Sequence, residues 1–126
     1  MKIFCTGNSQ KQNFYSTLNY IISITKEYKH KIYLDNAVQN QEKYNIDILS
    51  FSEINKNNDI DLVFSIGGDG ALLNCVRNMS NTQKPLLGIH IGDLGFLNQI
   101  NKSNIDVFLH ELYTVNDHKL ISYPLL

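Results

Sequence analysis

The sequence predicts an α/β fold in which a parallel sheet lies between helices on both faces, giving three layers. Short apolar runs, which are typical of buried strands, alternate along the 126 residues with amphipathic segments at helical spacing. Six of the seven glycines also gather in two segments, residues 67–70 and 88–95, each within or just after an apolar run. Glycine turns at strand ends are typical of α/β sheets that bind ligands.

The first half of the chain contains three predicted strands and one long helix. Residues 3–7 are predicted to form a strand and a turn. Ser9 and Gln12 have the spacing of a capping box, after which an amphipathic helix is expected. Its apolar face comprises Phe14, Leu18, Ile21, Ile22 and Thr25. The other predictions are strands at 31–34 and 46–51, a polar loop at 35–45 and a polar turn at 55–59.

The second half repeats the alternation of strand and helix. An apolar strand at residues 61–66 leads into the first glycine segment, and a strand at 86–91 leads into the second. Ser103 and Asp106 are spaced to cap a final helix. The buried face of that helix is predicted to comprise Ile105, Phe108, Leu109 and Leu112. A helix is also predicted at 71–79, with an apolar face of Leu72, Leu73, Val76 and Met79.

Composition is that of a single globular domain and excludes several classes of protein. The chain is 43% hydrophobic and 18% charged, and its net charge of −1 argues against binding to nucleic acid or to an anionic membrane. No apolar stretch approaches the roughly 20 residues that span a bilayer. Cys5 and Cys75 have no metal-site spacing, so we expect reduced thiols in a cytoplasmic protein.

Residues 65–70, Ser-Ile-Gly-Gly-Asp-Gly, form the strongest candidate site. Three glycines let the backbone turn sharply and approach a ligand closely. The following helix begins with unpaired N–H groups, which bind phosphate well. Asp69 adds a carboxylate, which suggests work on a hydroxyl group or a metal as well as anion binding. The alternative is a structural turn, because Gly-Asp-Gly also forms tight turns without any ligand.

A second glycine-spaced segment follows at residues 85–97, Pro-Leu-Leu-Gly-Ile-His-Ile-Gly-Asp-Leu-Gly-Phe-Leu. Because parallel strands end at one edge of a sheet, we expect residues 67–70 and 92–95 to form a single site there. His90 is interpreted as a hydrogen-bonded structural group and Asp93 as a turn residue. The chain contains no P-loop motif. It also lacks Gly-x-Gly-x-x-Gly, which argues against a hydride-transfer enzyme.

The two segments together resemble the N-terminal domain of NAD kinases. The Gly-Gly-Asp-Gly turn is also similar to that of phosphofructokinases and of diacylglycerol and sphingosine kinases, whereas residues 88–97 resemble NAD kinases in particular. The resemblance covers most of residues 59–126 and implies the Rossmann-like sheet of this superfold. Ala71 stands where the family usually has Thr or Ser. His90 and Asp93 also depart from the usual Asn and from the usual basic or small polar residue.

The resemblance implies phosphoryl transfer from ATP, or from polyphosphate, to the 2′-hydroxyl of the adenosine ribose of NAD. Asp69 would be the catalytic residue, orienting this hydroxyl and accepting its proton late in the reaction. Mg²⁺ would bridge the donor phosphates, held mostly by phosphate oxygens and water, and no protein ligand to a metal is assigned. The backbone of Gly67, Gly68 and Gly70 would admit the donor phosphates, and Leu94, Gly95 and Phe96 would lie near the adenine side of NAD. The alternative for Phe96, as an apolar residue, is packing in the core.

The resemblance also implies how the chain is organised. Residues 1–118 would form an α/β nucleotide-binding domain, and residues 119–126 would begin the crossover into a β-rich C-terminal domain. The full-length protein is expected to be a homo-oligomer that binds NAD and ATP and binds neither nucleic acid nor membrane. The alternatives are a lipid or sugar kinase with the same glycine turn and a non-catalytic fragment that binds nucleotide weakly or not at all.

Overall fold

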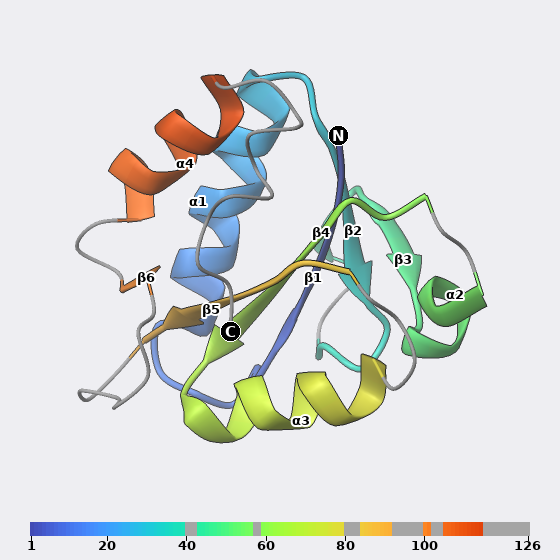
Figure 1. Ribbon diagram of the computed structural model, residues 1–126. Coiled ribbons are helices and arrows are strands. Elements are labelled where there is room, and N and C mark those ends of the chain that lie inside the picture. Colours follow the sequence, from blue (N-terminus) through green and yellow to red (C-terminus); the bar gives the residue numbers. More distant parts are fainter. Residues whose placement is uncertain (40–42, 57–58, 80–83, 92–99, 102–104, 115–126) are drawn as a thin grey trace.

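A computed structural model describes residues 1–39, 43–56, 59–79, 84–91, 100–101 and 105–114 of the protein (Figure 1). The strands are β1 (Lys2–Gly7), β2 (Lys31–Asp35), β3 (Asp47–Leu49), β4 (Leu62–Gly67), β5 (Leu86–His90) and β6 (Ile100–Asn101). The helices are α1 (Phe14–Glu27), α2 (Phe51–Lys56), α3 (Asp69–Met79) and α4 (Ile105–Thr114). Among these helices, none is long and apolar enough to cross a bilayer.

Within the described residues, all six strands pair in parallel and form one sheet in the order β3-β2-β1-β4-β5-β6. This is the order of Rossmann-like folds, in which the direction of winding reverses between the first and fourth strands. The predicted fold class is therefore confirmed. The predicted strands β1, β2, β4 and β5 are confirmed to within one residue at each end, whereas β6 was not predicted.

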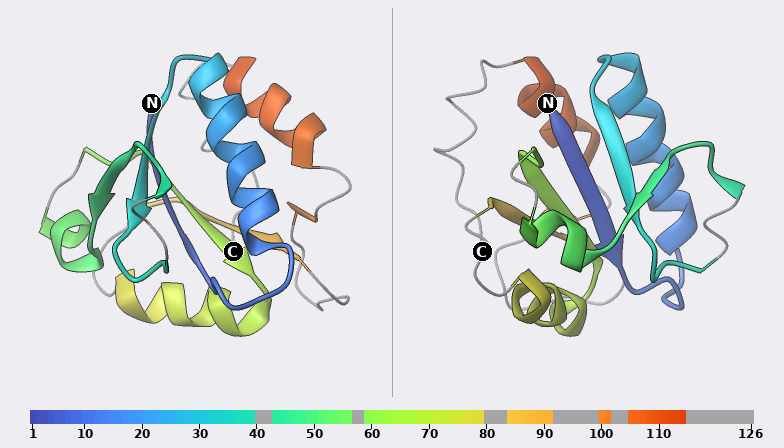
Figure 2. Two further views of the ribbon diagram at one scale, coloured as in Figure 1. Left: turned by 180° about the vertical axis from the view of Figure 1, so that it is seen from behind. Right: turned by 90° about the vertical axis from the view of Figure 1, so that its right-hand side faces the viewer.

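Helices cover both faces of the sheet, as the three-layer prediction requires. Helices α1 and α4 lie on one face, and α2 and α3 lie on the other (Figures 1 and 2). The two sides of the sheet alternate along each strand. In β1, Ile3 and Cys5 pack in the core beneath α1 and α4, whereas Phe4 packs against the α3 side. Strand β4 is buried along its whole length, which is typical of a central strand.

The start of α1 differs from the prediction. The predicted capping box of Ser9 and Gln12 is wrong, because α1 begins at Phe14 after Asn13, whose φ of 72° is left-handed and whose side chain makes no capping hydrogen bond. The preceding loop instead turns on Asn8. Its side-chain oxygen accepts the N–H of Gln10 at 3.0 Å, and its carbonyl accepts the N–H of Lys11 at 3.1 Å. The residues that were expected to begin the helix, 9–12, therefore lie in these turns and not in α1.

Helix α2 was not predicted. Residues 47–49 do form a strand, but the predicted strand extends too far, because α2 begins at Phe51. The predicted turn at 55–59 is wrong for residues 55–56, which end α2, whereas Asp59 does lie in a turn and residues 57–58 lie outside the described residues. A capping box starts the helix. The N–H of Ser50 donates to Glu53 Oε1 at 3.0 Å, and the N–H of Glu53 donates to Ser50 Oγ at 3.2 Å. Ile54 is fully buried and anchors the helix in the core.

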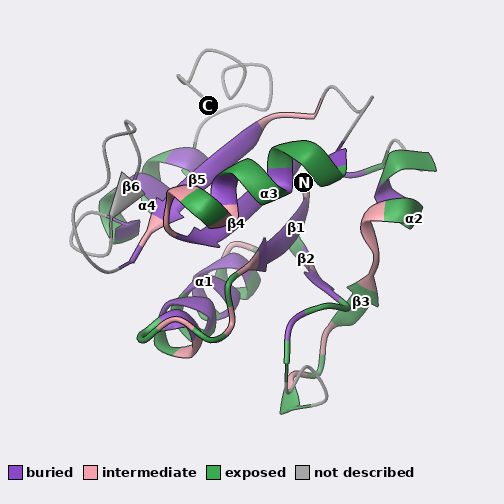
Figure 3. Cartoon of the chain, turned by 90° about the horizontal axis from the view of Figure 1, so that it is seen from below, coloured by how far each residue is buried: buried purple, intermediate pink, exposed green. Residues whose placement is uncertain are grey.

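Helix α3 begins at Asp69, two residues before the predicted start, and turns a different face inward. Leu72 and Met79 are buried as predicted, but the third buried residue is Cys75. Leu73 and Val76 are 54% and 49% exposed, so their predicted place in the core is wrong. Figure 3 shows this exposed outer side of α3 above the buried strands. A helix that packs on a sheet needs only a narrow apolar stripe, and residues 72, 75 and 79 supply it.

Helix α4 follows the prediction closely. Ile105, Phe108, Leu109 and Leu112 are all buried, as their helical spacing predicted. Asp106 lies inside the first turn, where its Oδ1 accepts the N–H of Val107 at 2.9 Å. The proposed cap at Ser103 lies outside the described residues, as does the predicted domain boundary at residue 118.

Gly7, at the end of β1, lies against Ile66 of β4 with no room for a side chain. A side-chain carbon at Gly7 would lie 2.0 Å from the carbonyl oxygen of Ile66 in β4, and its φ of 148° is unfavourable for other residues. The N–H of Asn8 donates to the same carbonyl at 2.9 Å, which fixes the two strand ends against each other.

We predict that Gly7→Ala lowers the free energy of unfolding by at least about 2 kcal/mol, because the new methyl group displaces backbone atoms and the backbone is strained. Urea unfolding measures this change. The matched control is Gly70→Ala, where the added carbon meets nothing within 4 Å, so we expect a change below about 1 kcal/mol. Equal losses for the two variants would contradict the close approach at Gly7.

Candidate active site at the carboxyl ends of the strands

The candidate site lies where the carboxyl ends of β1, β4 and β5 meet. This is the point at which the strand order reverses, and ligands of α/β sheets bind at such points. Backbone hydrogen bonds connect the three strand ends. The N–H of Asn8 donates to Ile66, and the N–H of Ile91 donates to the carbonyl of Gly67 at 2.9 Å. Residues that follow these strands therefore start from one fixed edge.

The three glycines of the predicted phosphate turn differ in their surroundings. Gly67 is buried, its φ is 157°, and a side-chain carbon there would lie 2.7 Å from Cβ of Ala71. Its structural role is to let α3 turn back sharply over β4. Gly70 is exposed, and a side-chain carbon there would meet nothing within 4 Å. Gly68 and Gly70 are therefore better placed than Gly67 to contact a ligand from outside.

Asp69 is the first residue of α3 and is half-buried. The hydrogen bond from the N–H of Leu72 to the carbonyl of Gly68, at 3.2 Å, marks the beginning of the helix. The first turn of a helix has N–H groups that the helix itself cannot satisfy, and the helix dipole is positive there. The structure thus places a carboxylate beside a feature that attracts anions, as the sequence predicted for this turn.

Lys11 is a site residue that sequence reasoning missed. It lies in the loop after β1, and a side-chain carbon built on Gly68 would be 3.2 Å from Lys11 Nζ. The ammonium group is therefore next to the glycine turn, although 57 positions separate the two residues in the sequence. One weak signal was available. Lys11 is the only Lys or Arg between Lys2 and Lys26. The combination of a cation with a helix N-terminus favours a phosphate ligand.

A hollow of about 360 Å³ opens beside the turn, on the α3 side of the sheet. Its described lining residues are Thr6, Gly7, Asn8, Gly70, Ala71, Asn74 and Cys75. At its base, the hydroxyl group of Thr6 donates to Asp35 Oδ2 at 2.6 Å. Asp35 is 4% exposed, and its Oδ1 accepts the N–H of Ala37 at 3.1 Å. Sequence reasoning missed this buried polar pair.

The charge of Asp35 affects the thiol of Cys75, which lines the hollow. Burial, and secondarily the Asp35 carboxylate, raise the pKa of the Cys75 thiol to about 12. Cys75 is therefore a neutral thiol at physiological pH, since the thiolate is the reactive form of cysteine. The structure gives it no role as a nucleophile.

Two further polar side chains lie on the same side of the sheet. Ser65 is beside Thr6 in the register of β4 and β1, and its Oγ is buried with no hydrogen-bond partner among the described residues. His90 pairs in register with Gly67, and both of its ring nitrogens are buried without a partner in the same part of the structure. The hydrogen bond expected for His90 is therefore not seen within the described residues. Such groups are rare in folded proteins and are found at functional sites.

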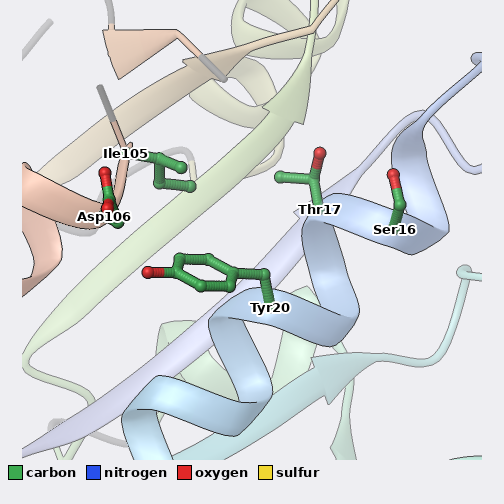
Figure 4. A pocket seen from close by; sticks show the side chains of 5 residues that line it. All are labelled: Ser16, Thr17, Tyr20, Ile105 and Asp106. Carbon is green, nitrogen blue, oxygen red and sulfur yellow. The ribbon is translucent and has the colours of Figure 1, made fainter. Parts of the chain in front are cut away.

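A second hollow, of about 370 Å³, lies on the opposite face of the sheet between α1 and α4. Figure 4 shows Tyr20 reaching from α1 toward Ile105 and Asp106 at the start of α4. Its described lining includes an acid and no basic side chain, so it does not suit an anionic ligand. The hollow at the glycine turn is the better candidate, because it lies at the N-terminus of α3, has polar lining residues and is close to the turn that Lys11 contacts.

Several predicted residues cannot be placed. Asp93, Leu94, Gly95 and Phe96 lie outside the described residues. Strand β5, which leads to them, ends at His90 on the same edge as β4. Among the residues that the structure describes, no group of three or more His, Cys, Asp or Glu side chains could hold a metal ion.

Comparisons with known proteins agree with this geometry. Residues 6–117 match the family model of the ATP-NAD kinase N-terminal domain. A protein of Clostridium beijerinckii named NAD kinase is 37% identical over 92 residues, which are 71% of this chain and 29% of that protein. One of Campylobacter lari with the same name is 30% identical over 115 residues, 88% of this chain and 38% of that protein.

The chain thus spans well under half the length of these relatives. A third relative of the same name, from Christiangramia forsetii, is 34% identical over 94 residues, 75% of this chain and 30% of that protein. The family match covers most of the chain and includes the glycine turn, the loop of Lys11 and the hollow beside them. The chain belongs to the family of ATP-NAD kinase N-terminal domains.

Proposed function

We propose that the full-length protein transfers a phosphoryl group to the 2′-hydroxyl of the adenosine ribose of NAD, producing NADP. The observation that carries this proposal is the position of Asp69, a carboxylate on the first turn of α3 beside an anion-binding turn. Relatives that share this part of the chain are named NAD kinase. A site that holds phosphates and also presents a carboxylate suits phosphoryl transfer to a hydroxyl group.

In this proposal Asp69 orients the 2′-hydroxyl and accepts its proton as the new bond forms. A carboxylate is far too weak a base to ionise a ribose hydroxyl in advance. Its contribution therefore comes in the transition state, when the hydroxyl becomes more acidic. Phosphoryl transfer depends mainly on alignment and charge stabilisation. One well-placed carboxylate therefore suffices as the acid–base group of the reaction.

The donor phosphates are proposed to lie against Gly68, Gly70 and Lys11, where the helix dipole and the ammonium group offset their charge. Gly67 contributes by shaping the turn. The described residues offer no cluster of metal ligands. Mg²⁺ would fit as an ion held by phosphate oxygens and water, and it would neutralise charge on the transferring group.

The adenine side of NAD is proposed to lie near Leu94, Gly95 and Phe96, which follow β5 in the sequence; β5 itself ends at the same edge as the glycine turn. Further contacts would come from a second domain of the full-length protein. We also propose that the protein works as a homo-oligomer in the cytoplasm, where thiols such as those of Cys5 and Cys75 stay reduced.

Asp69→Asn should reduce the rate of NADP formation by about two to four orders of magnitude, because the amide cannot accept the proton. The two side chains have nearly the same shape, so thermal unfolding should change little. The measurement is a coupled assay for NADP on the full-length protein. A variant that retains near-normal turnover would show that Asp69 is only a turn residue.

Lys11→Met should weaken the apparent affinity for the phosphoryl donor by about tenfold or more, since a hydrogen bond to a charged group contributes about 1.5–3 kcal/mol. The loss of donor affinity caused by Lys11→Met should be smaller at high salt, because salt screens the attraction between the ammonium group and the phosphates. Lys26→Met is the control, because Lys26 is an exposed cation in the last turn of α1. If both variants changed the donor KM equally, Lys11 would have no specific role.

Residues 1–126 alone should have little or no NAD kinase activity. In-line phosphoryl transfer requires the donor and acceptor to be held in close alignment, and this chain would hold the substrates from one side only. The same NADP assay, run on the 126-residue chain, tests this. Robust production of NADP that is lost with Asp69→Asn would show that this domain carries the whole site.

A further inference from the structure

Helices α1 and α4 converge toward their C-terminal ends and separate toward their N-terminal ends (Figures 1 and 2). Where they converge, the hydroxyl groups of Thr25 and Tyr113 are 2.7 Å apart, and the hydroxyl group of Tyr28 is 2.6 Å from His110 Nδ1. The hollow of about 370 Å³ opens where they separate. Its volume is within the range of about 300–1,000 Å³ that is typical of small-molecule sites.

One end of this hollow is negatively charged. Asp106 lies there, on the first turn of α4, and Tyr20 extends from α1 toward it (Figure 4). Burial, followed by the carboxylates of Asp106 and Glu27, raises the pKa of Tyr20. The lining residues that the structure describes include no basic side chain to offset these charges. A ligand group at this end is therefore favoured if it is positively charged.

An organic cation fits this end better than a metal ion. Asp106 is the single carboxylate in the described lining, whereas a protein site for a hard metal ion needs several oxygen ligands. The lining is otherwise mainly apolar and includes Ile105. The ring of Tyr20 is 38% exposed, and the face of such a ring attracts an ammonium group. These features suit an ammonium group that is attached to an apolar body.

The other end of the hollow contains a buried hydroxyl group. Thr17 is 3% exposed, and its Oγ1 has no hydrogen-bond partner in the described structure. Figure 4 shows it on the side of the hollow away from Asp106. The neighbouring hydroxyl group of Ser16 already donates to the carbonyl of Asn13 at 3.1 Å. An unpaired buried hydroxyl costs free energy, and a polar group of a ligand could pair with it.

We propose that the hollow between α1 and α4 binds a small organic amine. The ammonium group lies at Asp106, the apolar body lies against Tyr20 and Ile105, and a hydrogen-bonding group at the far end of the ligand pairs with Thr17. This site is on the opposite face of the sheet from the glycine turn. It is therefore separate from the proposed NAD kinase site, and the inference does not depend on the proposed function.

The test uses three probes of similar size, added to the full-length protein and followed by the NMR shifts of the backbone amides of Thr17, Tyr20 and Asp106. Tyramine carries an ammonium group and a distant hydroxyl. It should bind at least about tenfold more tightly than 3-(4-hydroxyphenyl)propionate, in which a carboxylate replaces the ammonium group. Phenethylamine lacks the hydroxyl and should bind about fivefold more weakly than tyramine.

Two variants assign these preferences to residues. Asp106→Asn removes the charge and keeps an oxygen that can accept the N–H of Val107, and it should weaken tyramine binding at least about tenfold. Glu111→Gln is the control, because Glu111 is an exposed acid on the same helix outside the described lining, and we expect a change below about twofold. Thr17→Val should reduce the affinity for tyramine to that for phenethylamine, and it should leave phenethylamine binding unchanged.

Several results would overturn the inference. They are equal affinities for tyramine and the carboxylate probe, an absence of shifts at the three amides with millimolar tyramine, and tyramine binding that either Asp106→Asn or Thr17→Val leaves unchanged. Thermal unfolding of each variant checks that it is folded. Because Asp106 is exposed, Asp106→Asn tests the site even where Thr17→Val, at a buried position, impairs folding.

Discussion

The close approach of β1 and β4 at Gly7 is the constraint on which the rest of the site depends. No side chain fits between Gly7 and the carbonyl of Ile66, and that carbonyl accepts the N–H of Asn8. The loop after β1 therefore leaves the sheet directly beside the glycine turn. A wider separation of the two strands would move Lys11 away from Gly68 and would open the base of the hollow.

Electrostatic asymmetry follows from this geometry. The positive end of α3 and the Lys11 ammonium lie beside the glycine turn, whereas the buried carboxylate of Asp35 is hydrogen-bonded to Thr6 in β1. Asp35 ends β2 and Gly67 ends β4, on the two sides of β1.

Much of the fold could be predicted from the sequence because local patterns and tertiary packing agree there. Apolar runs marked the central strands β1, β4 and β5, and helical spacing marked α4. Prediction failed where packing or turn chemistry decided between alternatives. On α3, the sequence pattern allowed either Val76 or Cys75 to face the sheet. Cys75 faces it because of the orientation in which the helix packs over β4, which the pattern does not specify. Lys11 and Asp35 belong to no recognisable sequence motif. They come close to the site only in the folded chain, so the sequence alone did not indicate them.

The central claim is that nucleotide binds at the carboxyl edge between β1, β4 and α3. Backbone amide chemical shifts, measured by NMR as ATP is added, test it most directly. The account predicts the largest shifts at Gly68, Gly70 and Lys11, with smaller changes at Thr6. Shifts confined to Tyr20 and Asp106, in the hollow between α1 and α4, would place the ligand on the other face of the sheet and contradict the account.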